Sequence, residues 1–188
     1  VLDNFSNSSP NVFKKIREIS NCDINFETVD LICFDRLKQI FFDFGPDLII
    51  HLAGLKSVKE SILKPIEYWD TNVFGTINLL KVMDKYECKV FVFSSSATIY
   101  GASSMVPIPE NAPINPLNPY GNTKVAIEKI LFDIAGCNGT NEIKLHSKTG
   151  WRIARLRYFN PVGAHVSGLI GEAPQGIPNN LFPYISEV

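Results

Sequence analysis

A tyrosine and a lysine, Tyr120 and Lys124, stand four residues apart just after Pro119. On a helix that starts near Tyr120 the two side chains share one face, so a phenol and an ammonium are neighbours. A phenol has a pKa of about 10 and is a poor base at neutral pH, but a nearby ammonium favours the phenolate. The spacing therefore predicts a group that takes a proton from an alcohol, although an ordinary helix pair has the same spacing.

Three hydroxyl groups end an apolar run upstream of this pair. Residues 90–93 are Val-Phe-Val-Phe, and Ser94, Ser95 and Ser96 follow directly. The pattern predicts a buried strand whose carboxyl end delivers the hydroxyls to an open edge. A serine there could hold the same substrate oxygen as Tyr120. Serine, tyrosine and lysine together favour chemistry in which an alcohol loses its proton while another group takes the hydride.

Composition excludes several other classes of protein. The chain has 188 residues, of which 45% are hydrophobic and 20% charged, and its net charge is −1. Its length suits one good core, its Lys and Arg are scattered, and no apolar run is long enough for a membrane span. The four cysteines lie far apart and predict neither a zinc site nor a disulfide framework. A cytoplasmic protein without a metal site or a nucleic-acid partner is therefore expected.

Strands and helices alternate along the chain, which predicts an α/β fold: a Rossmann-like, doubly wound, mostly parallel sheet. Ligands of such sheets bind at the carboxyl ends of the strands, and polar or small residues follow the predicted strands there. Strands are expected at 24–30, 48–54, 90–96 and 151–159, and helices at 12–19, 36–44, 57–63, 65–85 and 120–135. The continuous apolar run at 48–54 is typical of a central parallel strand, and Phe44 is expected on the inner face of the helix at 36–44.

Three further residues allow two interpretations each. Asp3 follows an apolar pair; at the end of a second strand it would accept bonds from an adenosine ribose and favour NAD, but a turn aspartate is the alternative. His51 lies within an apolar run, which is more typical of a core histidine than of a catalyst. Asn72 interrupts a helical stretch and would bond either the neighbouring strand or a cofactor.

These residues resemble the extended short-chain dehydrogenase/reductase family, and within it the UDP-glucose 4-epimerases. The matching motifs run in order through nearly the whole chain. They are Asp-Asn-Phe-Ser-Asn-Ser from position 3, His-Leu-Ala-Gly-Leu-Lys-Ser-Val from 51, Asn-Val-Phe-Gly-Thr from 72, Ser-Ser-Ser-Ala-Thr-Ile-Tyr-Gly from 94, Tyr-Gly-Asn-Thr-Lys from 120, Arg-Tyr-Phe-Asn-Pro-Val-Gly-Ala-His from 157 and Pro-Gln-Gly-Ile-Pro-Asn-Asn-Leu from 174.

The resemblance implies an isomerase of galactose metabolism that interconverts UDP-glucose and UDP-galactose by transient oxidation at C4 with bound NAD. Tyr120 would be the base at the sugar 4-hydroxyl, Lys124 would hold the nicotinamide ribose, and Ser96 would bond the reacting oxygen. It also implies cofactor contacts from Asp3, Asn4, Asp30, Leu31, Leu52, Ala53, Gly54, Lys56, Asn72, Ser94, Tyr120, Lys124 and Phe159, and substrate contacts from Lys56, Ser96, Tyr120, Asn160 and Asn180.

The resemblance further implies a fragment, because the family's first strand and glycine-rich loop would precede residue 1. Residues 1–159 would be the NAD-binding domain and 160–188 the start of a truncated nucleotide-sugar lobe, the fragment alone being inactive. One alternative is a nucleotide-sugar 4,6-dehydratase, which usually has an Asp-Glu pair where this chain has Ala97 and Thr98. A non-catalytic nucleotide-sugar-binding fragment is the other. A homodimer is possible, and the acceptance of N-acetylated sugars stays open.

Overall fold

The structure, a computed structural model, describes residues 1–136, 149–172 and 181–186. Its contacts divide the chain into two units, one of residues 1–30 with 160–188 and one of residues 31–159. Both units contain parallel strands joined through helices, so the α/β class expected from the sequence is confirmed.

The unit of residues 31–159 is built on a parallel sheet with the strand order β3-β4-β5. The strands are β3 (Ile49–His51), β4 (Val90–Ser96) and β5 (Arg152–Tyr158). Phe93 of the central strand β4 is in register with His51 on one side and Arg155 on the other. The apolar run followed by serines is thus the central strand of this sheet, as the sequence predicts.

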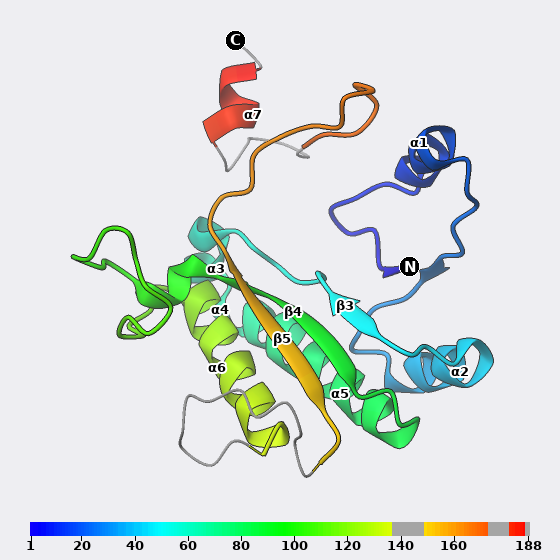
Figure 1. The fold of residues 1–188 in the computed structure, drawn as a ribbon, viewed down its shortest axis with the longest axis horizontal. Helices are drawn as coiled ribbons and strands as arrows, with labels where there is room; N and C mark the ends of the chain where they lie inside the picture. Colours follow the sequence, from blue (N-terminus) through cyan, green and yellow to red (C-terminus); the bar gives the residue numbers. More distant parts are fainter. Residues whose placement is uncertain (137–148, 173–180, 187–188) are drawn as a thin grey trace. The chain divides into compact units, whose positions relative to one another are not determined.

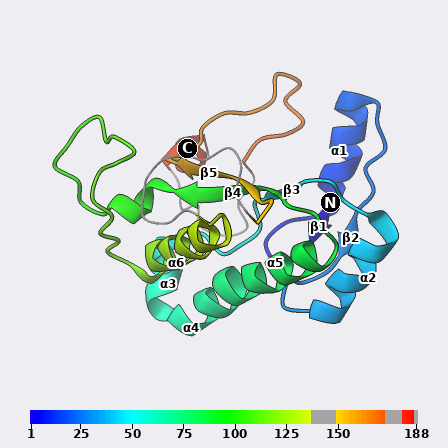
Figure 2. The ribbon, with the colours of Figure 1, turned by 60° about the horizontal axis from the view of Figure 1, so that its bottom comes forward.

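Helices connect these strands, because parallel neighbours need a crossover connection. Two of the helices, α5 and α6, lie side by side on the same face of the sheet (Figures 1 and 2). The helical segments of this unit are α2 (Phe34–Phe44), α3 (Val58–Leu63), α4 (Pro65–Tyr68), a π-helical stretch (Trp69–Phe74), α5 (Gly75–Lys85), a 3₁₀ turn (Ala97–Tyr100) and α6 (Pro119–Ile134).

The core lies between the central strand and these helices. Successive side chains of a strand point to opposite faces, and the alternate residues Phe91, Phe93 and Ser95 of β4 are buried, as is Ser96 at its end. The two phenylalanine rings are stacked with their centroids 6.4 Å apart. Among the buried residues of α5 and α6 are Met83 and Leu131. This packing holds the carboxyl end of β4 against α6.

Helix α6 begins where the sequence predicts. Asn118 is its N-cap, and the Asn118 side chain accepts a hydrogen bond of 2.8 Å from the backbone N–H of Gly121. Pro119 occupies the first helical position, where its missing N–H costs nothing. The cap fixes the helix start immediately before Tyr120.

The unit of residues 1–30 and 160–188 contains β1 (Leu2–Asp3), α1 (Asn11–Ser20), β2 (Glu27–Thr28) and α7 (Leu181–Ser186), and its two strands pair in parallel. The strand expected over residues 24–30 is only two residues long. Phe26 is instead engaged in an aromatic cluster, its ring stacked on that of Phe13 at 4.4 Å and edge-on to that of Phe5. The apolar alternation of this stretch therefore serves ring packing more than strand length.

One expectation about burial is wrong. Phe44, expected on the inner face of its helix, is 68% exposed, because it is the last residue of α2 and the left-handed Gly45 follows it. Residues 48–54 were expected to form a strand like a central parallel one; within the described residues β3 pairs with β4, and Ile50 is 60% exposed.

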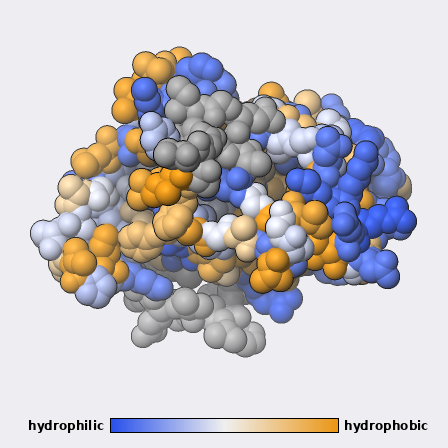
Figure 3. All heavy atoms as spheres, turned by 90° about the horizontal axis from the view of Figure 1, so that it is seen from above, coloured by the Kyte–Doolittle hydropathy of each residue, from blue (hydrophilic) through white to orange (hydrophobic). Residues whose placement is uncertain are grey.

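Hydrophobic side chains also reach the surface in many places, and Figure 3 shows them interspersed with hydrophilic ones on one face. Such exposure is normal for single residues. Within residues 1–136, 149–172 and 181–186, no helix combines the length and the apolar character that crossing a membrane requires.

Neighbouring phenylalanines of α2 provide a stability test of this core. Phe41 is 2% exposed and Phe42 is 72% exposed. We expect Phe41→Ala to lower the free energy of unfolding by about 3–5 kcal/mol through a lost apolar contact and a cavity. Phe42→Ala should change it by less than about 0.5 kcal/mol. Urea denaturation of both variants measures the difference, and equal losses would contradict the packing described here.

Candidate active site

The predicted catalytic residues meet at the carboxyl end of β4. Tyr120 and Lys124 are both buried on α6, at 9% and 6% exposure, and the Lys124 ammonium lies 5.7 Å from the centroid of the Tyr120 ring. Ser94 and Ser96 lie at the carboxyl end of the facing strand β4. The shared helix face and the strand end with its hydroxyls are both present, as the sequence predicts.

The Lys124 side chain crosses from the helix to the strand. Its Nζ donates a hydrogen bond of 2.8 Å to the backbone carbonyl of Ser94 and lies 4.8 Å from the centroid of the Phe93 ring. Burial disfavours the charged ammonium and lowers the Lys124 pKa from 10.5 to about 8. The lysine is thus a fixed cation whose charge is expensive to keep in this position.

Ser96 is oriented by a residue that sequence reasoning did not single out. The Ser96 oxygen accepts from the Thr98 hydroxyl at 2.9 Å and from the Thr98 N–H at 3.2 Å. Both bonds leave the Ser96 hydrogen directed elsewhere, and Ser96 is the hydrogen-bond partner that lowers the pKa of Tyr120. Thr98 therefore fixes the position of the Ser96 oxygen.

Burial has the larger effect on Tyr120, and on balance it raises the pKa of the phenol despite the opposing effect of the Ser96 hydroxyl. The lowering that was expected from Lys124 is not found. The physical reason is the direction of the ammonium, which bonds the carbonyl of Ser94 and not the phenol oxygen. The group that stabilises the phenolate in this structure is the serine.

Asn72 ties the loop after β3 to the catalytic helix. Its Oδ1 accepts from the N–H of Leu55 at 2.8 Å, and its Nδ2 donates to the Leu55 carbonyl at 3.0 Å and to the Thr123 hydroxyl at 3.2 Å. Asn72 belongs to the π-helical stretch Trp69–Phe74, a geometry often found at functional sites. Of its two interpretations, the structure shows the bond to the backbone beside the strand.

The Asn72 side chain also explains why residue 54 is a glycine. Gly54 has φ +142°, and a Cβ there would lie 2.9 Å from Oδ1 of Asn72. Only glycine combines this backbone conformation with such a close approach. Beside this glycine, Leu52 is 68% exposed, and Ala53 and Lys56 are also exposed.

The residues expected at the adenosine ribose and adenine gather at the ends of β1 and β2. Asn4 donates from Nδ2 to the Asp30 carboxylate at 2.8 Å. Oδ1 of Asp3 accepts from the N–H of Phe5 at 2.7 Å and from the Ser8 hydroxyl at 3.1 Å. Asp3 thus closes a turn, and the structure places it beside the other two predicted residues.

The other predicted residues are distributed as follows. Leu31 is half-buried, and its backbone carbonyl accepts from Asn78 of α5 at 3.3 Å. Phe159 is 65% exposed and Asn160 is also exposed. Asn180 and most of the motif that starts at position 174 lie outside the described residues.

His51 is a satisfied core residue. Its Nε2 lies 2.8 Å from the Thr76 hydroxyl, which itself donates to the Asn72 carbonyl. Burial, with the charge of Lys124 as a second cause, lowers the His51 pKa to about 3. The imidazole is therefore neutral and serves the packing of β3 on α5.

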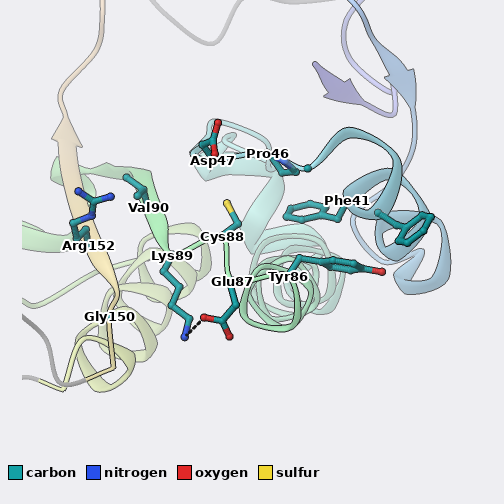
Figure 4. Close-up of a pocket in the computed structure, with 12 residues that line it drawn as sticks. Phe41, Pro46, Asp47, Tyr86, Glu87, Cys88, Lys89, Val90, Gly150 and Arg152 are labelled. Atoms are coloured by element: carbon teal, nitrogen blue, oxygen red, sulfur yellow. Dashed lines mark ion pairs between the residues drawn. The ribbon is translucent and has the colours of Figure 1, made fainter.

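A hollow of about 590 Å³ lies at the opposite end of the sheet from Tyr120. Val90 and Arg152, the first residues of β4 and β5, line it together with Cys88 and the ion pair of Lys89 with Glu87 (Figure 4). None of the predicted site residues lines it. Within the described parts of the chain, no group of three His, Cys, Asp or Glu side chains could hold a metal ion.

Comparison with known proteins places the chain. The model of the NAD dependent epimerase/dehydratase family matches residues 1–186. The chain belongs to this family. Over its whole length it is 46% identical to UDP-glucose 4-epimerase 2 of Arabidopsis thaliana and 45% identical to UDP-glucose 4-epimerase of Bacillus subtilis, in each case covering 52% of the relative.

Solved structures agree. The UDP-glucose 4-epimerase of Bifidobacterium longum, in complex with NAD⁺ and UDP, superimposes with a TM-score of 0.89 and 43% identity, over 99% of this chain and 53% of that one. The chain thus spans about half the length of the relatives that it matches. The predicted resemblance to this group of enzymes, as a fragment, is confirmed.

The buried lysine predicts a dependence of stability on pH. Its pKa is about 8 in the folded protein and 10.5 when unperturbed. Between these values the unfolded chain binds more protons, so the stability contributed by Lys124 is present above 10.5 and lost as the pH falls through 8. We expect Lys124→Met to be more stable than the wild type at pH 7, by up to about 3 kcal/mol.

This advantage should shrink as the pH approaches 10.5. Urea denaturation of both proteins at several pH values measures it, and titrating groups that do not interact with Lys124 cancel in the difference. A difference in the free energy of unfolding that does not vary with pH would contradict the burial of a charged lysine.

Proposed function

We propose that the protein containing this chain is a UDP-glucose 4-epimerase, an isomerase that interconverts UDP-glucose and UDP-galactose. The observation that carries the proposal is the grouping of Tyr120, Lys124 and Ser96 at the carboxyl end of a central parallel strand. Identity of about half along the whole chain to enzymes of that name supports the choice of reaction.

The residues present suit an NAD cofactor. Gly54, with no side chain, and the loop held by Asn72 leave backbone accessible beside β3. Asp3, Asn4 and Asp30 would hold the adenosine end, and Lys124 the nicotinamide ribose. Ser94, Phe159 and the loop residues would complete the cofactor contacts, with residues 1–159 acting as the cofactor-binding domain. When bound, NAD would accept the hydride of C4 and return it.

Tyr120 would handle the proton of the sugar 4-hydroxyl. As a phenolate it takes this proton on the outward step and gives it back on the return, so the residue ends unchanged. Between the two steps the 4-keto sugar turns about its link to the diphosphate and presents its other face, which inverts C4. Ser96 donates a hydrogen bond to the oxygen that bears the charge.

Inversion requires a firm hold on UDP and a loose hold on the hexose. We assign the substrate contacts of this chain to Lys56, Ser96, Tyr120, Asn160 and Asn180, with residues 160–188 as the start of a nucleotide-sugar lobe. Lys56 is exposed, which suits contact with a ligand.

The 4,6-dehydratase reaction is less well supported. It begins with the same oxidation, but it then needs an acid and a base to eliminate water. Ala97 and Thr98 occupy the corresponding positions. The Thr98 hydroxyl donates to Ser96, which commits it to orienting the serine. A purely binding role would leave the oriented tyrosine, serine and lysine without a purpose, and turnover by the full-length protein distinguishes these cases.

The proposal includes a cytoplasmic location, and a homodimer is consistent with it. Exposed apolar side chains of α3 and α4, among them Leu63 and Ile66 at 75% each, would suit burial against a second copy. Light scattering of the full-length protein gives its oligomeric state.

Loss of the phenol should remove most of the activity. A general acid–base group typically contributes about 10²–10⁴-fold to a rate, so we expect Tyr120→Phe in the full-length protein to lose that much turnover of UDP-galactose. Ser96→Ala should cost less, because it removes one hydrogen bond to the reacting oxygen and leaves the base. Conversion of UDP-galactose to UDP-glucose measures both.

Tyr86→Phe is the matched control, since Tyr86 lines the hollow at the opposite end of the sheet. It should turn over at the wild-type rate. Circular dichroism and bound NAD establish that each variant is folded. If Tyr120→Phe kept wild-type turnover, another base would have to exist and the assignment would fail.

Asp3 should determine which dinucleotide binds. A carboxylate at the ribose repels the 2′-phosphate of NADP, so the full-length Asp3→Ala variant should lose much of its preference for NAD. Titration calorimetry with both dinucleotides measures the ratio of the two dissociation constants. An unchanged ratio would mean that another group recognises the ribose and that Asp3 serves only its turn.

A further inference from the structure

Helix α6 carries a third buried functional group beyond Tyr120 and Lys124. Glu128 lies four residues after Lys124 and eight after Tyr120, so all three side chains share one face of the helix. Glu128 is 3% exposed. A carboxylate is almost never buried to this extent unless it is paired.

Glu128 has partners on both strands that face it. The Ser95 hydroxyl of β4 donates to its Oε1 at 2.5 Å. Arg157 of β5 donates from Nε to Oε1 at 3.0 Å and from Nη2 to Oε2 at 2.7 Å, which is a bidentate pair. Arg155 adds a longer contact of 3.5 Å. Burial raises the pKa of Glu128, but these bonds and charges outweigh it, so the pKa is lowered and the carboxylate stays ionised.

Arg157 extends this network beyond the helix. Its Nη1 donates to the Tyr100 hydroxyl and to the Glu110 carbonyl, both at 2.7 Å. One carboxylate on α6 is therefore connected to β4, to β5 and to the segment that follows the 3₁₀ turn. Phe159 and Asn160, which we assign to the cofactor and the substrate, stand two and three residues after Arg157.

Three residues of α6, spaced four apart, thus face three consecutive residues of β4. Tyr120 interacts with the Ser96 hydroxyl, Lys124 with the Ser94 carbonyl and Glu128 with the Ser95 hydroxyl. Apolar packing is not directional, so Ile127 and Leu131 would tolerate small shifts of the helix along the strand. The bidentate pair of Glu128 with Arg157 is directional and would not.

Stability alone does not explain a buried ion pair. Removing two charges from water is costly, and apolar residues of similar volume are often as stable or more stable in their place. The network is therefore better explained by the geometry that it imposes than by the free energy of folding that it contributes.

We propose that Glu128 is a positioning residue. It fixes the position of helix α6 along strands β4 and β5, so that Lys124 bonds the Ser94 carbonyl and Tyr120 lies beside Ser96. The inference rests on the proposed function for its kinetic consequence, but its geometric content is independent of that function.

The test uses the full-length protein with Glu128→Gln and with the double replacement Glu128→Met and Arg157→Met. Asp133→Asn is the matched control, an exposed carboxylate on the same helix. We expect both Glu128 variants to lose ~10–100-fold in kcat for UDP-galactose with little change in KM, because misplacement of about 1 Å can cost that much. The double variant should recover the wild-type Tm without recovering kcat, and the control should match the wild type in both.

A wild-type kcat in a Glu128 variant would overturn the proposal, because the ion pair would then be merely structural. The second readout is the crystal structure of Glu128→Gln, where Nζ of Lys124 should lie beyond hydrogen-bond distance of the Ser94 carbonyl. An unchanged bond there also overturns the proposal. If the wild type does not convert UDP-galactose, the proposed function fails, and the position of Lys124 in this crystal structure still decides the role of Glu128.

Discussion

The bond from the Lys124 ammonium to the Ser94 carbonyl is the constraint on which the candidate site depends. It joins the helix that carries the tyrosine to the strand that carries the serines, across 30 residues of sequence. Burial makes the charge costly, and the Phe93 ring beneath it offers only partial compensation. A buried lysine of this kind lowers the stability of the fold, but its ammonium is held in one position. Functional sites commonly trade stability for geometry in this way.

Near this bond, hydrogen bonds of polar side chains fix the positions of backbone segments. Apolar packing alone is not directional and would allow these segments to shift. Asn72 uses its amide oxygen and nitrogen on Leu55, and its nitrogen also reaches Thr123, whose hydroxyl donates to the carbonyl of Tyr120. The loop after β3 and the first turn of α6 are thereby linked through one side chain. The π-helical stretch that contains Asn72 replaces regular α-helical geometry at this point. The π-helical stretch therefore lies where the loop after β3 contacts helix α6 through Asn72.

The pKa values of the site are set by burial more than by neighbouring charge. Burial is the first cause of the shifts at Tyr120, Lys124 and His51, and it favours the neutral form of each. Glu128 differs, because hydrogen bonds and two arginines outweigh its burial. Burial therefore opposes the charge of the residues assigned to chemistry, although Lys124, with a pKa of about 8, is still protonated at pH 7. The carboxylate of Glu128 instead stays ionised, because its partners favour the charge.

The sequence by itself determined the local features: the helix that Asn118 and Pro119 begin, the strand that ends in serines, and the spacing that places Tyr120 and Lys124 on one face. These follow from periods of two and about four residues, which depend only on near neighbours. Even Glu128 could have been found by extending that spacing one turn further. Only the tertiary structure decided which residues Glu128 contacts. Its partner Arg157 lies 29 residues away in the sequence, and Tyr100, which Arg157 also contacts, lies 57 residues from Arg157. The tertiary structure also decided that Lys124 bonds a carbonyl and not the phenol. Such contacts depend on how separate elements meet in space, and no local pattern encodes that.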